Sequence, residues 1–126
     1  MEKEFVTYEL ALRMKQLGFN KPCFARFSND GDLLIAHTEK YIISNGVDRS
    51  EFFTLAPTWQ QAFRWFRKMY QLHSTITSIS QDSWQWHITK PGESLGKLYD
   101  EDFYTYEEAE LFCLEKLIEI VESKSE

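Results

Sequence analysis

The sequence offers few side chains that could act together as nucleophile and base. Its two cysteines, Cys23 and Cys113, are far apart, lie among apolar residues, and have neither a Cys-x-x-Cys nor a Cys/His ligand spacing. The three histidines, His37, His73 and His87, are not flanked by a nucleophile motif. We therefore expect two buried free thiols and surface or edge-strand histidines, with no catalytic residue among them.

The sequence also gives little indication of a phosphate-binding or metal-binding site. The five glycines occur singly, so no glycine-rich loop precedes a helix. The run Asp100-Glu101-Asp102, followed by Glu107 and Glu108, lacks the alternating oxygen ligands and the turn glycine of a calcium loop. We interpret it as a solvated acidic loop, with a weak divalent-cation site as the alternative. We expect no metal and no cofactor.

Basic and aromatic side chains interleave at Arg64, Trp65, Arg67 and Lys68. Such a group could neutralise and stack on single-stranded nucleic acid. The alternative is that the three basic residues form the solvated side of an amphipathic helix. Trp65 lies at the margin of that side, so it either closes the rim of the core or anchors a contact. These four residues are the candidate binding residues.

Three amphipathic helices would position these groups, near residues 7–17, 58–70 and 105–122. The central helix, TWQQAFRWFRKMY, has a basic face and, opposite it, a mainly aromatic apolar face. The apolar face includes Trp59, Phe63, Phe66 and Met69. Gly18 is a natural left-handed residue at the end of the first helix, and Thr105-x-x-Glu108 is a capping box before the last. Each helix follows a threonine that can cap it: Thr7, Thr58 and Thr105.

The segments between the helices are short, rich in β-branched or aromatic residues, and joined by turns. Expected strands are 23–28, 33–38, 40–44, 75–80 and 83–89, with a sixth short one at 95–99. The stretch 47–57 is either an irregular lead-in or a short strand. Short connections favour antiparallel pairing, so we predict an α+β fold. It would have one antiparallel sheet of about five strands and three helices mostly on one face, in the order α-β-β-β-α-β-β-(β)-α.

The last helix has an apolar arc of about half its circumference, more than one sheet needs. Either the first helix covers the surplus with Tyr8 and Leu12, or a second copy of the chain does, giving a homodimer. The candidate interface residues are Leu111, Leu114 and Ile118, to which Val121 can be added.

Composition limits the class of protein. The 126 residues suit a single domain, 1–126, and no apolar run is long enough to cross a membrane. The beginning of the chain has no long apolar segment typical of a secretory signal, so a cytoplasmic location is expected. The net charge is −6, and residues 75–126 contain four basic and twelve acidic side chains. An acidic chain of this kind makes nucleic acid an unlikely partner.

Three stretches together, FVTYELALRMKQLGFNKPCFARF, APTWQQAFRWFRKMY and TYEEAELFCLEKLIEIV, carry a family resemblance. The chain resembles a group of short hypothetical proteins from phages and prophage-like elements of gut bacteria. This resemblance implies a bacterial or phage origin. No activity is assigned to that group, so no functional residue is carried over from it.

By elimination, the sequence predicts a small non-catalytic protein that binds or assembles with another protein, such as a phage or mobile-element accessory factor. One alternative is a nucleic-acid-associated module that uses the helix at 58–70. The other is an enzyme of unfamiliar type. The sequence does not name the protein partner.

Overall fold

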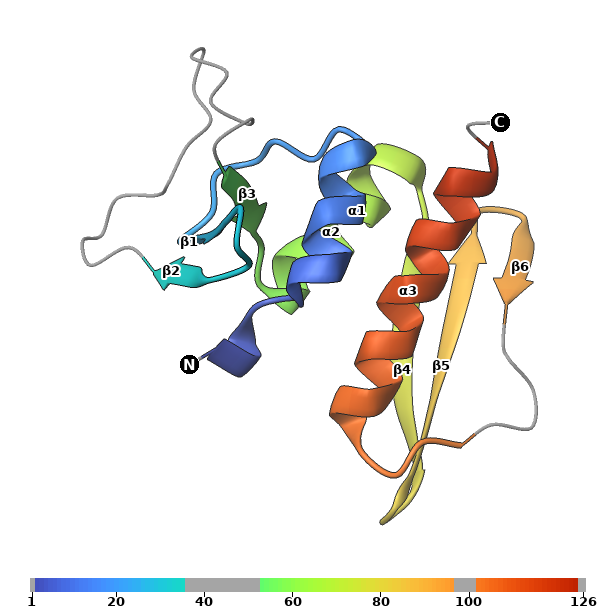
Figure 1. Cartoon of the computed structure of the whole chain (residues 1–126). Helices are drawn as coiled ribbons and strands as arrows, with labels where there is room; N and C mark the ends of the chain where they lie inside the picture. Colours follow the sequence, from blue (N-terminus) through green and yellow to red (C-terminus); the bar gives the residue numbers. More distant parts are fainter. Residues whose placement is uncertain (1, 36–52, 97–101, 125–126) are drawn as a thin grey trace. The chain divides into compact units, whose positions relative to one another are not determined.

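The computed structural model describes residues 2–35, 53–96 and 102–124 (Figure 1). In these residues the class is α+β, with three α-helices and antiparallel strands, as the sequence predicts. The strands are divided between two sheets instead of forming one. Contacts within the chain define two compact units, Met1–Ala62 and Phe63–Glu126, and each is described here by itself. The assignment of one domain to the whole chain stays a prediction.

The first unit contains a small antiparallel sheet with the strand order β2-β1-β3. The turn at Asn29–Asp32 joins β1 to β2, and the two strands pair antiparallel, as the short connection predicts. The stretch 47–57 contains a short strand, β3, with Phe53 and Leu55 buried. The strand predicted at 40–44 lies outside the described residues. The elements are η1 (Glu2–Glu4), α1 (Tyr8–Gln16), β1 (Ala25–Ser28), β2 (Leu33–Ile35) and β3 (Phe53–Ala56).

Local sequence sets both ends of α1. The Thr7 hydroxyl accepts a hydrogen bond from the Leu10 N–H at 3.4 Å. At the other end Gly18 has a left-handed φ of +99°. The Phe19 N–H then donates to the Met14 carbonyl at 3.0 Å, which completes a Schellman ending around Gly18.

Tyr8, at the start of α1, packs on the β1–β2 hairpin. Its ring centroid lies 5.3 Å from that of Phe27, and its hydroxyl donates to the Asn29 carbonyl at 3.3 Å. Gly31 has a φ of +87°, and a Cβ built there would lie 3.2 Å from the Tyr8 ring. The hairpin therefore needs glycine at this position. Tyr8 thus packs on the hairpin, and the cover of the last helix by Tyr8 and Leu12 stays a prediction.

The second unit has a sheet of order β4-β5-β6 with α3 on one face (Figure 1). Trp86 and Ile88 point to the α3 side and are buried, whereas Gln85 and His87 lie on the other face, as the alternation predicts. The strand expected at 95–99 is described only to Gly96 and begins at Glu93, while residues 97–99 lie outside the described residues. The elements are α2 (Trp59–Tyr70), which begins in the first unit, β4 (His73–Ser80), β5 (Ser83–Lys90), β6 (Glu93–Gly96) and α3 (Tyr106–Lys124).

The predicted threonine caps of α2 and α3 are confirmed. The Thr58 hydroxyl accepts from the Gln61 N–H at 3.2 Å, and the Thr105 hydroxyl accepts from the Glu108 N–H at 3.1 Å. The Gln61 side chain donates to the Pro22 carbonyl instead of completing a capping box. It thereby ties the start of α2 to the segment before β1.

Gln71 ends α2 in a left-handed conformation, with a φ of +57°. A side chain with a Cβ is disfavoured there, so Gln71→Gly is expected to stabilise the protein by about 0.5–1 kcal/mol. Thermal unfolding measures this gain. The matched control is Gln60→Gly, in an ordinary turn of the same helix, which is expected to cost up to about 1 kcal/mol. Equal losses in both variants would contradict the prediction.

Candidate protein-binding surface

The basic-aromatic group on α2 does not form one surface. Arg64, Arg67 and Lys68 are exposed, but Trp65 is only 5% exposed. Its ring lies edge-on to those of Phe66, at 5.0 Å, and Tyr70, at 5.5 Å. The structure therefore supports a core role for Trp65 over a contact role, and the indole is not available for stacking on a base. Met69, which the helical pattern placed on the buried side, is 53% exposed.

The residues proposed for an interface between copies lie mainly in the interior. Leu114 and Ile118 have no exposed surface in the single chain, and Leu111 is half-buried. Val121 is also buried. Leu114, Ile118 and Val121 are therefore core residues of the single chain. Leu111 is the one of the three candidates with exposed surface, and the homodimer stays a prediction.

Neither thiol is suited to nucleophilic chemistry at neutral pH. Burial raises the pKa of Cys113 to about 12, although a hydrogen bond with Ser74 lowers it in part. Burial likewise raises the pKa of Cys23 to about 12, with a smaller opposing contribution from Gln61. Because the thiolate is the nucleophile, these raised pKa values disfavour reaction of either thiol near neutral pH.

The acidic run is only partly described. Asp102 accepts a hydrogen bond from the Gln85 side chain at 2.6 Å, whereas Asp100 and Glu101 lie outside the described residues, as does His37. Within the described ranges, no group of three or more histidine, cysteine or acidic side chains is placed to hold a metal ion. Asp102 is therefore a residue that links β5 to the segment leading into α3.

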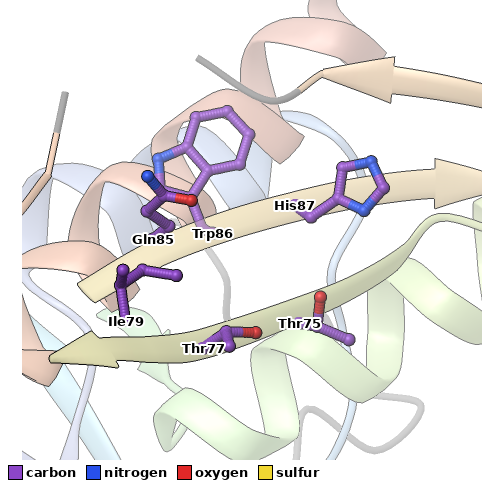
Figure 2. Close-up of a pocket in the computed structure, with 6 residues that line it drawn as sticks. All are labelled: Thr75, Thr77, Ile79, Gln85, Trp86 and His87. Carbon is purple, nitrogen blue, oxygen red and sulfur yellow. The ribbon is translucent and has the colours of Figure 1, made fainter. Parts of the chain in front are cut away.

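A shallow, open hollow of about 340 Å³ lies on the β4–β5 hairpin (Figure 2). Its side chains include no acidic residue, lysine or arginine, and they offer hydroxyl, amide and imidazole groups. Thr75 pairs with His87 across the two strands, and Thr77 with Gln85. These four residues lie on the sheet face turned away from α3. The residues that line it are Thr75, Thr77, Ile79, Gln85, Trp86 and His87.

Exposed aromatic rings gather where the chain enters α3. Tyr104 is 76% exposed, and Tyr106 and Phe112 are each 41% exposed. Phe103 pairs with Trp84 of β5 through two backbone hydrogen bonds of 2.8 and 2.9 Å, which fixes this segment against the sheet. We call Trp84, Tyr104, Tyr106 and Phe112 the aromatic surface.

Ring contacts hold part of the aromatic surface in place. The Tyr106 ring stands edge-on to that of Trp84 at 5.4 Å, and Phe112 stacks on buried Phe103 at 4.9 Å. Two exposed rings are thus each supported by another ring. Such rings lose little conformational entropy when a partner binds, because their positions are already set.

The surroundings of the aromatic surface are acidic. Between Asp102 and Glu115 the chain contains five acidic and no basic side chains. Burial, and then the charges of Glu110, Cys113 and Glu107, raise the pKa of Tyr106. The phenol is therefore held in its neutral form and can donate a hydrogen bond.

Sequence reasoning did not identify the aromatic surface. Part of its signal was present, because Tyr104 and Tyr106 flank the cap residue Thr105 and three acidic residues follow closely. Phe112 lies outside the apolar arc of α3, and an aromatic residue on the polar side of a helix is itself a reason to look for a contact.

Comparisons with known proteins add no relative: no protein-family model, curated protein or solved structure matches this chain. Across the part of the chain that the structure describes, no helix combines the length and the apolar character needed to cross a bilayer.

Proposed function

We propose that this chain is a small non-catalytic binding protein that holds a basic segment of a partner protein on its aromatic surface. The observation that carries the proposal is the exposure of Tyr104, Tyr106 and Phe112 within an acidic stretch. The resemblance to phage and prophage proteins makes the proposed setting that of an accessory factor acting on a host or phage protein.

The rings supply the apolar part of such a contact. Single exposed apolar residues are common on protein surfaces, but three exposed aromatic rings within nine residues form a concentrated group. Tyrosine is among the residue types that contribute most to binding free energy at interfaces. Tyr104, the most exposed of the three, is expected to gain the most burial when a partner binds.

The acidic side chains select the kind of partner. Glu107 and Glu108 are exposed beside Tyr106, and Asp102 is exposed at the other end of the segment. Lysine and arginine side chains would be attracted to these carboxylates and could also lie over the aromatic faces. A basic, partly apolar peptide segment therefore fits this surface better than an acidic partner or a nucleic acid.

Tyr104→Ala is expected to weaken binding of a lysine- and arginine-rich peptide containing interspersed leucines by about tenfold, as for a typical interface aromatic. Titration followed by tryptophan fluorescence measures the affinity. Because Tyr104 is 76% exposed, the change should leave the fold intact. The matched control is Phe24→Ala, at an exposed aromatic residue of the first unit, which should bind as the wild type does.

Two further measurements test the charge component. Affinity for the basic peptide should fall as salt is added, and a peptide with glutamate in place of lysine and arginine should not bind. Equal binding of both peptides, or equal loss in the Tyr104 and Phe24 variants, would reject this surface. If the basic peptide binds and the glutamate peptide does not, the candidate partners are the proteins that the wild type retains from a bacterial lysate and Tyr104→Ala does not.

A further inference from the structure

Strand β4 is an edge of the second sheet. It pairs along its whole length with β5, from His73 opposite Thr89 to Ser80 opposite Ser83. In the described sheet no strand lies on its other side. The other edge of β5 is covered at one end by β6 and at the other by the bridge to Phe103. β4 is therefore the long open edge.

This edge lacks the usual protection. Proteins commonly place charges, proline or very short strands at sheet edges, because unpaired backbone groups invite another strand. β4 is eight residues long, HSTITSIS, and contains no proline, lysine, arginine or acidic residue. Most of its residues are exposed. Its single irregularity is a shift of register between Ser78 and Ser80, which limits regular pairing to the preceding part of the strand.

We infer that the β4 edge binds the β4 edge of a second copy, joining two sheets into one antiparallel sheet across a two-fold axis. This inference does not depend on the proposed function, because it uses a different surface. A foreign strand could pair with the same backbone groups, but three features of this strand favour a second copy.

Charge is the first feature. Two copies with a net charge of −6 repel each other. The repulsion is weakest where they meet along a strand that contains no acidic residue, such as β4. The bridge to Phe103 and the hydrogen bond from Gln85 place Asp102 at the edge of β5 opposite β4. Pairing through β4 therefore keeps the Asp102 carboxylates of the two copies at opposite ends of the joined sheet.

Self-complementarity is the second feature. A two-fold axis perpendicular to the sheet reverses strand direction and keeps side chains on their own face, so one residue must oppose itself. With Ile76 at the axis, Thr75 opposes Thr77 of the second copy and Ser74 opposes its Ser78. Like residues then meet from Ser74 to Ser78, and threonine pairs are favourable across strands. Moving the axis to Thr75 would instead set Ser74 against Ile76.

Closure is the third feature. Among the described strands, each copy offers one long open edge, since β6 and the Phe103 segment occupy the far side of β5. Pairing through β4 uses that edge in both copies and leaves no described edge of comparable length for a third. The product is a closed dimer instead of a fibre.

Sedimentation velocity over a concentration series tests the inference with two double variants. Thr75→Lys/Thr77→Lys sets lysine against lysine at two symmetric positions and is expected to weaken the dimer roughly tenfold or more. Thr75→Lys/Thr77→Glu sets lysine against glutamate of the second copy and is expected to retain it. Both threonines are exposed, so circular dichroism should show the same fold in all three proteins.

The two charge patterns also test the register. If the axis lay at Thr75, the lysine introduced there would face the same lysine of the second copy. The second variant would then dissociate as readily as the first. That result would overturn the stated register. A wild type that stays monomeric throughout the series, or a dimer that persists unchanged in the double-lysine variant, would overturn the interface itself. Tyr104→Ala should leave the dimer unchanged, which separates this test from that of peptide binding.

Discussion

Ile118→Glu is expected to unfold the protein, with a loss of more than ~4 kcal/mol, because the new carboxylate would be buried without a partner. Ile118 has no exposed surface in the single chain. Circular dichroism and thermal unfolding measure the loss. The matched control on the same helix is Ile120→Glu, at a half-exposed position, which should remain folded.

The same pair of variants separates the two explanations for the wide apolar arc of α3. A folded, monomeric Ile118→Glu variant from a dimeric wild type would mean that α3 forms an interface between copies. The burial of Leu114 and Ile118 predicts the other result, in which the variant fails to fold at any concentration. Ile118→Val, which removes one methylene, should cost only about 0.5–1.5 kcal/mol.

The helices could be predicted from sequence because the signals that begin and end them are local. Thr7 and Thr58 cap helices through hydrogen bonds to residues three positions ahead, and Gly18 ends one through its own φ. The division of strands into two sheets could not be predicted in this way. β3 pairs with β1, from which it is separated by more than twenty residues, and no local pattern specifies that pairing.

The candidate site was less predictable because exposure depends on tertiary packing. Trp65 and Met69 both lie near the edge of the apolar arc of α2, and only the packed structure shows that Trp65 is buried and Met69 exposed. The exposure of Tyr106 and Phe112 likewise depends on how α3 lies on β5. Sequence pattern identified the acidic character of the region but not the rings within it.

Alkaline pH is expected to destabilise the protein through its two buried thiols. Their pKa values are raised from 9.0 to about 12, so between these values the unfolded chain loses protons that the folded chain keeps. The stabilisation is fully present below pH 9 and is lost as pH rises toward 12. Each thiol should lower the free energy of unfolding by about 1.4 kcal/mol per pH unit in that range.

Urea unfolding at a series of pH values from 8 to 11 measures this slope. The control is Cys23→Ala/Cys113→Ala, which keeps every other titrating group, so the difference in slope between the two proteins belongs to the thiols. That difference should approach twice the single-thiol value. Equal slopes would show that the thiols titrate normally. Rapid reaction of native Cys113 with a thiol reagent at pH 8 would contradict its burial, because a protonated, buried thiol reacts only when the chain opens.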